Sequence, residues 1–236
     1  MKARNLLVFI FIFIMVAILI LFPLGQNYAE SVYLKNLSGI ENKSLVSTII
    51  VLPDDQDQWD EAEVIIERIS GLPEGLLQVL KKNGIKIKLF TGSLTDQREA
   101  AHLKRVQPRG YSSKNWDEVP GMGGSKTVLV KIGHSEKGAG HGSTNLELHE
   151  LGHSVDQIIL NNISETGYFQ DAWLKEVQQL FPNQTYFIDY PEEYFAEFFA
   201  MYYFNQETKA ECLEKAPLTY EIIRNIEQNG YTVKEQ

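Results

Sequence analysis

The spacing of apolar positions changes along the chain, from strand-like segments in the first half to helix-like segments in the second. Short apolar or alternating runs at 45–52, 85–90 and 127–132 predict three strands. Apolar residues at helical spacing predict helices at 58–69, 74–82 and 95–105, and later at 144–161, 166–181, 191–206 and 217–228. Strands early and helices late predict an α+β fold, in which a small mixed N-terminal sheet with helices precedes a helical half.

The chain begins with a segment that is typical of membrane targeting. Two basic residues precede an unbroken apolar run at 6–22, and this run lacks the polar face of a soluble helix. We therefore predict a signal peptide or signal anchor over 1–29, a polar tether over 30–44 and a globular domain over 45–236. Both forms of the leader place the domain outside the cell, so we expect an extracellular protein that touches a membrane only through an uncleaved leader.

Composition narrows the chemistry. The chain has 22 Lys and Arg residues against 31 Asp and Glu residues, a formal net charge of −9. Such a charge repels phosphate backbones, so we expect no nucleic-acid partner. The single cysteine, Cys212, excludes both an intrachain disulfide and a metal site of the CxxC type. Any metal ligands must therefore be histidines and carboxylates.

The clearest chemical signal is the sequence HELGH at 149–153. On a helix, residues i and i+4 share a face, so His149 and His153 can bind one ion while Glu150 stands beside them. Catalytic zinc sites commonly use three protein ligands and leave one position for water, so the two histidines require a third ligand.

Two downstream glutamates are candidates for this ligand. Glu176 lies on a helix with an ordinary polar face, which predicts a solvated side chain. Glu197 lies inside a helix that begins at Pro191, and its neighbours are Phe, Ala and Tyr. A carboxylate among aromatic residues needs a compensating positive charge, and a metal ion supplies one. We therefore predict that Zn²⁺ binds to His149, His153 and Glu197.

These motifs also carry a resemblance to a known family. LELHELGHSVD at 146–156, followed by a Tyr-Pro pair and a Glu-rich aromatic helix, resembles the catalytic domain of anthrax lethal factor. The chain is even more similar to the secreted Pro-Pro endopeptidases, which are single-domain metalloproteases of the gluzincin type. The resemblance covers about 51–225 and implies the same zinc ligands. It further implies that Glu150 is the general base and that Tyr190, seven residues before Glu197, is the oxyanion partner.

Residues and resemblance together predict an extracellular zinc endopeptidase. We expect Glu150 to take a proton from a zinc-activated water that attacks an extended, Pro-containing segment of a secreted or surface protein. The strand at 127–132 leads towards the zinc helix, so we expect the peptide to pair with it as an edge strand. The alternative is a non-catalytic surface binding module that keeps the fold, and the presence of Glu150 favours the enzyme. We expect the protein to act as a monomer on a peptide or protein substrate.

Overall fold

The computed structural model of the chain describes residues 29–110 and 114–232. The chain divides into two compact units, one up to Ser38 and the other from Gly39 onward. The sheet, the labelled helices and the site described below all belong to the second unit.

The predicted leader and tether are described only in part. Residues 1–28 lie outside the described residues, and within the described ranges no helix is both long and apolar enough to cross a membrane. The predicted polar tether, 30–44, contains helical segments. Residues 29–36 are helical, and helix α2 begins at Lys43.

A small sheet forms the first part of the second unit. Within the described residues its strands are β1 (Ile50–Val51), β2 (Lys86–Phe90), β3 (Gly121–Met122) and β4 (Thr127–Lys131), in the spatial order β1-β2-β4-β3. Strands β1, β2 and β4 run parallel, and β3 runs antiparallel to β4, which confirms the predicted mixed sheet. Strand β4 is therefore interior, and β3 is the edge beside it. This corrects the prediction that 127–132 is an edge strand.

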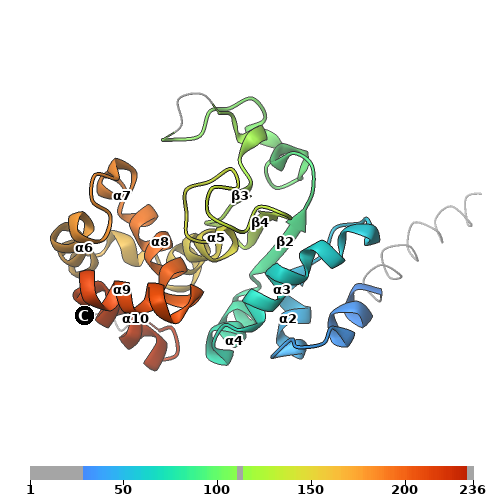
Figure 1. Cartoon of the computed structure of the whole chain (residues 1–236), viewed down its shortest axis with the longest axis horizontal. Helices are drawn as coiled ribbons and strands as arrows, with labels where there is room; N and C mark the ends of the chain where they lie inside the picture. The colour runs from blue at the N-terminus through green and yellow to red at the C-terminus, as the bar shows by residue number, and fades with distance from the viewer. Residues whose placement is uncertain (1–28, 111–113, 233–236) are drawn as a thin grey trace, which may run out of the picture. The chain divides into compact units, whose positions relative to one another are not determined.

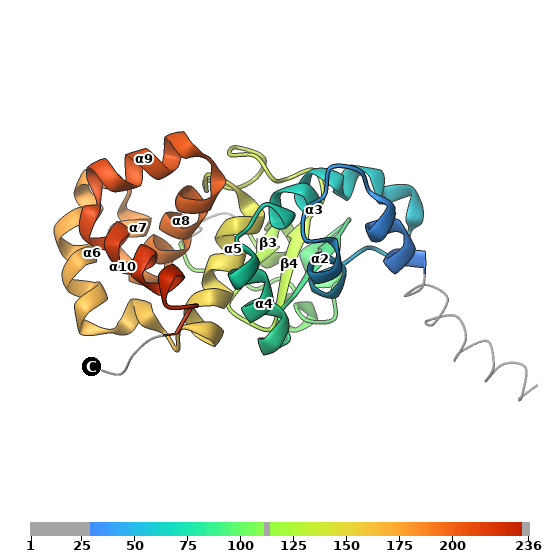
Figure 2. The ribbon, with the colours of Figure 1, turned by 90° about the horizontal axis from the view of Figure 1, so that it is seen from below.

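Helices cover the sheet and build the rest of the unit. Their bounds are α2 (Lys43–Ile49), α3 (Glu63–Ser70), α4 (Glu74–Asn83), α5 (Leu146–Ser154), α6 (Gly167–Leu180), α7 (Thr185–Asp189), α8 (Pro191–Phe204), α9 (Gln206–Lys215) and α10 (Pro217–Gln228). Helix α5 continues as a π-helical turn over Val155–Ile159. Figure 1 shows α5 between the sheet with α2–α4 and the group of helices α6–α10, and the turned view in Figure 2 shows the same order. This is the predicted α+β fold with a helical second half.

Two predicted segments adopt other structures. The run 45–52 is mostly helix α2, and only its last part is strand. Short apolar runs do not distinguish a buried helix from a strand, which explains the error. The predicted helix at 95–105 is instead a pair of 3₁₀ turns, Leu94–Asp96 and Ala101–Leu103. The first of these turns belongs to an apolar cluster with the strand residue Phe90.

Helices α5 and α8 pack closely against each other. A Cβ atom at Gly152 of α5 would lie 2.9 Å from the Cα atom of Ala196 on α8, so a larger residue does not fit at this point. Helix α8 is buried on all sides over 193–202. Its far side packs on α6, where the ring centroids of Phe169 and Phe195 are 5.6 Å apart. This packing fixes which residues α8 turns towards α5.

An ion pair at the buried side of α5 joins this helix to α3. Nε of Arg68 donates to Oε1 of Glu147 over 3.1 Å, and the Glu147 side chain is fully buried. The same guanidinium group pairs with Glu136 at 3.2 Å and lies 4.5 Å from the ring centroid of Phe204. Because a buried carboxylate without a partner is costly, this pair fixes how α3 lies against α5.

We predict that Arg68→Met lowers the free energy of unfolding by about 3 kcal/mol, because it leaves the buried carboxylate of Glu147 without its partner. Denaturant unfolding of the metal-free protein measures the loss. The double variant Arg68→Met/Glu147→Leu should recover most of it, since no buried charge then remains. Arg224→Met, which breaks a surface pair, should have a far smaller effect. An equal loss in the single and double variants would contradict this account.

Candidate metal centre

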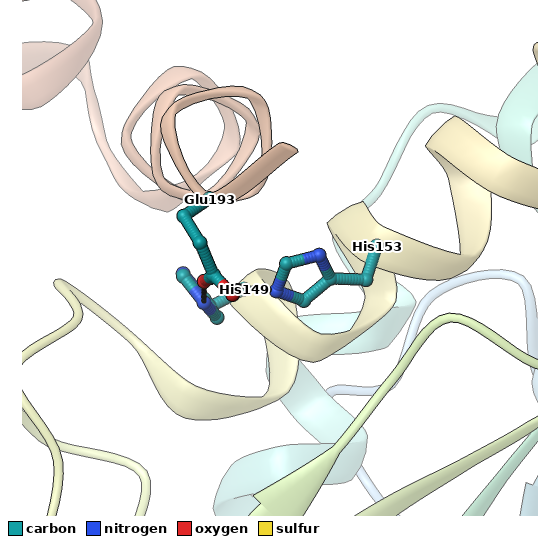
Figure 3. Close-up of side chains that lie close together, drawn as sticks. All are labelled: His149, His153 and Glu193. Atoms are coloured by element: carbon teal, nitrogen blue, oxygen red, sulfur yellow. Dashed lines mark ion pairs between the residues drawn. The ribbon is translucent and has the colours of Figure 1, made fainter. Parts of the chain in front are cut away.

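Three side chains from α5 and α8 converge on one point (Figure 3). His149 and His153 project from α5 one helical turn apart, and Glu193 reaches them from the first turn of α8. Oε2 of Glu193 lies 3.4 Å from Nε2 of His149 and 3.3 Å from Nε2 of His153. One ligand atom of each residue lies within 4.8 Å of the other two. The three side chains are only 10–12% exposed.

This set of donor atoms fits a metal ion such as zinc. Two neutral imidazoles and one carboxylate are the ligand set of many catalytic zinc sites, in which one further position remains for water or substrate. The ligand atoms come from two helices that pack tightly, so the protein places them before any ion binds.

The charges of the cluster also favour a cation. Burial opposes ionisation of Glu193, but the two imidazoles outweigh it and hold the pKa of this carboxyl well below its usual range. Burial likewise opposes the charged form of His149, yet its bonds to Glu193 and Glu197 outweigh burial and raise the pKa of His149 to about 10. The carboxylates are therefore ionised at neutral pH, and they attract either a proton on His149 or a metal ion.

Glu150 lies beside this cluster, against the edge of the sheet. A Cβ atom at Gly121 of β3 would lie 2.7 Å from Cγ of Glu150, and one at Gly123 would lie 2.0 Å from the Glu150 backbone oxygen. Glycine at both positions lets the edge strand touch the helix. Burial raises the pKa of Glu150, against the opposing effect of His149 and His153. A carboxyl group with a raised pKa beside a metal site is suited to accept and return a proton.

The cluster and Glu150 line a cavity of about 650 Å³. An apolar part of its wall is formed by Trp116, Val119 and Met122, which lie on β3 or just before it. Tyr186 on α7 forms another part of the wall. Cavities of this size and character bind small ligands or short peptide segments.

Comparison with known families shows to which family the chain is related. The family model described as anthrax toxin lethal factor, N- and C-terminal domain, matches residues 37–226. The chain belongs to the anthrax lethal factor family. The resemblance inferred from the HELGH region is therefore confirmed.

Within and around this family, the similar proteins include two Pro-Pro endopeptidases. One, from Clostridioides difficile, is 44% identical over 188 residues, which cover 79% of this chain and 84% of that protein. Another, from Paenibacillus alvei, is 38% identical over 191 residues, which cover 80% of this chain and 88% of that protein. The solved structure of a Pro-Pro endopeptidase from Paenibacillus alvei matches with a TM-score of 0.72 at 38% identity, covering 77% of this chain and 99% of that one.

The predicted third ligand, Glu197, lies behind His149 rather than beside the two Nε2 atoms. Its Oε2 is 3.0 Å from Nδ1 of His149, and its Oε1 accepts from the N–H and the hydroxyl of Thr144 over 2.7 Å each. Glu193 and Glu197 are one turn apart on α8, so both face α5. Burial does not separate them, because both are buried. The structure thus brings Glu193, rather than the predicted Glu197, together with His149 and His153 as a set that could hold one ion.

The same one-turn shift applies to the predicted oxyanion partner. Tyr190 lies at the N-terminal end of α8, and the guanidinium group of Arg109 lies 4.0 Å from its ring centroid. Among the described tyrosines, the one that lines the cavity is Tyr186. Tyr186 precedes Glu193 by seven residues, just as Tyr190 precedes Glu197 by seven. A shift of one helical turn therefore relates the predicted pair, Tyr190 and Glu197, to the pair that lines the cavity, Tyr186 and Glu193.

Glu176, the other candidate ligand, was predicted to be solvated, but the structure buries it. It is 3% exposed and caps the start of α10. The backbone N–H groups of Leu218 and Thr219 donate to it over 2.6 and 2.9 Å, and the Thr219 hydroxyl donates over 2.8 Å. A helix N-terminus is thus sufficient to hold a buried carboxylate, and burial alone does not identify a metal ligand.

We predict that Glu193→Ala loses zinc during dialysis, whereas the unmodified chain and Glu192→Ala retain about one zinc ion per chain. Glu192 is the matched control, because it lies in the same turn of α8 but pairs with Arg109 at 2.6 Å. Elemental analysis of the dialysed proteins measures the zinc content. Full retention by Glu193→Ala would contradict the ligand set.

Proposed function

We propose that this chain is a zinc-dependent endopeptidase of the HExxH, gluzincin type, which hydrolyses the bond between two prolines in an extended segment of a peptide or protein. The observation that carries the proposal is the position of Glu150 beside the histidine–glutamate cluster, in one cavity of a chain that is 44% identical to a Pro-Pro endopeptidase. The Pro-Pro preference rests on the relatives, and the hydrolytic chemistry rests on the residues of the cavity.

Each of these cavity residues has a separate role in the proposed hydrolysis. His149, His153 and Glu193 would hold a zinc ion, which would act as a Lewis acid and lower the pKa of a bound water towards neutrality. Glu150 accepts a proton from water in the cavity and returns it to the leaving nitrogen. That nitrogen belongs to a proline ring and carries no hydrogen while the bond is intact, so this proton must be delivered. The phenol of Tyr186 can donate a hydrogen bond to the oxygen on which negative charge develops.

The edge strand β3 is the proposed platform for the substrate. An extended peptide is held well by pairing with the free edge of a sheet, and among the described strands β3 is the edge that touches Glu150. A proline has no N–H and interrupts such pairing, so the two prolines must lie where the backbone hydrogen bonds between peptide and β3 end. The apolar side chains of Trp116 and Met122 suit the rings of those prolines.

A non-catalytic binding module is the alternative function. Such a module has no need of a carboxyl group beside the metal ligands, but Glu150 is half-buried there and desolvation raises its pKa. The same residue that favours the enzyme in the sequence therefore favours it in the structure.

We further propose that the protein acts outside the cell. The support is the sequence of 1–28, where two basic residues precede a long apolar run. A leader of this kind directs the following domain across the membrane. The monomeric state stays a prediction.

We predict that the purified protein cleaves peptides that contain a Pro-Pro pair, and does not cleave matched peptides in which either proline is alanine. A peptide library read by mass spectrometry locates the cleaved bonds. A zinc chelator should abolish cleavage, and Glu150→Gln should lower turnover by several orders of magnitude while zinc content stays normal, because only proton transfer is lost. Cleavage by Glu150→Gln at the normal rate would refute the role of this residue.

Replacement of the two neighbouring tyrosines should separate their roles. We expect Tyr186→Phe to lower turnover by about 10²–10³ with little change in zinc content, the effect typical of removing one oxyanion donor. Tyr190→Phe is the matched control on the adjacent helix and should lower turnover much less. Steady-state kinetics on a Pro-Pro peptide measures both, and the opposite order would restore the role first predicted for Tyr190.

A further inference from the structure

Two side chains of the loop before α5 form a hydrogen-bonded pair in the wall of the cavity. Nδ1 of His141 lies 2.6 Å from Oγ of Ser143, and Nε2 of His141 lies 2.7 Å from the backbone oxygen of His134. Both His141 and Ser143 line the cavity, and Ser143 is only 6% exposed. Neither residue has a role in the hydrolysis proposed above.

The position of each hydrogen in this pair follows from its partners. The backbone oxygen of His134 can only accept, so Nε2 of His141 carries a hydrogen. Burial lowers the pKa of His141, which keeps the ring neutral at neutral pH. In this neutral ring Nδ1 is an acceptor, so the hydroxyl hydrogen of Ser143 points towards it. The oxygen of Ser143 therefore offers only lone pairs to the cavity.

Backbone contacts hold the pair in place from both sides. The N–H of Gly138 donates to the backbone oxygen of His141 over 3.1 Å, and Nζ of Lys114 donates to the backbone oxygen of Gly140 over 3.1 Å. The residue that follows the pair, Thr144, donates to a buried carboxylate of α8. The acceptor is thus positioned before a ligand enters, which reduces the entropy lost on binding.

An extended peptide on β3 needs hydrogen-bond partners on its other edge as well. Pairing with one strand leaves part of the backbone N–H and C=O groups of the peptide facing away from that strand. Inside a cavity these groups need a partner. The loop reaches the start of β3, because a Cβ atom at Gly140 would lie 3.8 Å from Cγ of Pro120. Among the described residues of the lining, Ser143 supplies the one serine or threonine hydroxyl.

We propose that Ser143, with its hydroxyl oriented by His141, is a specificity-determining residue that accepts a hydrogen bond from one backbone N–H of the substrate. The inference rests on the proposed function, because it takes an extended peptide as the occupant of the cavity. Since proline has no N–H, the cavity then rejects proline at that position. The substrate is accordingly a segment that contains a Pro-Pro pair but has a residue other than proline at one flanking position.

Peptides that contain an ester link test this hydrogen bond. An ester replaces one N–H by an oxygen without added bulk, and this oxygen would face the lone pairs of Ser143. Each flanking link of a Pro-Pro peptide is changed in turn, and its binding to zinc-loaded Glu150→Gln is measured by calorimetry. We expect the ester at one position to raise the Kd by about 10-fold, because the acceptor loses its donor. In Glu150→Gln/Ser143→Ala, ester and amide should bind equally at that position.

Two further variants separate this contact from other effects. Esters at positions that pair with β3 should weaken binding equally with and without the Ser143 hydroxyl. Ser125→Ala in the Glu150→Gln background is the matched control, because the Ser125 hydroxyl donates to the backbone oxygen of Thr127 and does not line the cavity. It should leave every ester effect unchanged. His141→Phe should give an intermediate effect, because the freed hydroxyl can turn and donate to the ester.

An ester effect that persists undiminished at every position in Ser143→Ala would overturn the inference, and so would the absence of any ester effect or of any peptide binding. If Ser143→Ala does not fold, His141→Phe replaces it, and an undiminished effect there overturns the inference. Binding is measured without cleavage. If the unmodified protein cleaves no Pro-Pro peptide, but the ester effect at one position disappears in Ser143→Ala, the proposed function is rejected and this inference stands.

Discussion

The candidate site depends on the close approach of two helix backbones, where Gly152 of α5 meets Ala196 of α8. Helix α5 supplies both imidazoles and helix α8 supplies both carboxylates that contact them, so the separation of the two axes sets every distance in the cluster. A glutamate side chain has a fixed reach. A larger side chain at Gly152 would push α8 outward and carry Glu193 and Glu197 away from the imidazoles.

An acidic chain that buries several carboxylates must provide a hydrogen-bond or charged partner for each of them. Glu147 is paired with Arg68, and Glu176 accepts from the first backbone N–H groups of α10. Glu193 contacts both histidines of the cluster, and Glu197 contacts His149. Only this last pair lies where two imidazoles and a cavity meet, and this combination, rather than burial, marks the site as chemical.

The parts of the site that were predictable from the sequence are those set by local spacing. His149, Glu150 and His153 follow from the geometry of one helical turn, and the structure places all three at one cavity. The third carboxylate depends on the rotation of α8 relative to α5, and no local pattern encodes it. Since Glu193 and Glu197 both face α5, the sequence offers two solutions that differ by one turn.

A local sequence pattern can also mislead, because tertiary partners change the role of a residue. Thr144 and Glu147 have the spacing of a capping box, but Asn145 is the N-cap of α5 and its side chain accepts from Leu148. The Thr144 hydroxyl instead donates to Glu197, and Glu147 instead forms an ion pair with Arg68. The fold class was predictable, because the order of strands and helices does not depend on which side chains pair with each other.

The contact between the edge strand and Glu150 restricts how this architecture can diverge. At Gly121 and Gly123 there is no room for a side chain against helix α5, so substitution there cannot adjust which ligands the cavity accepts. Gly142, which also lines the cavity, has open space around its Cβ position and an ordinary backbone conformation. New ligand preferences in descendants of this fold are therefore expected to arise in the loops around the cavity, while Gly121 and Gly123 remain glycines.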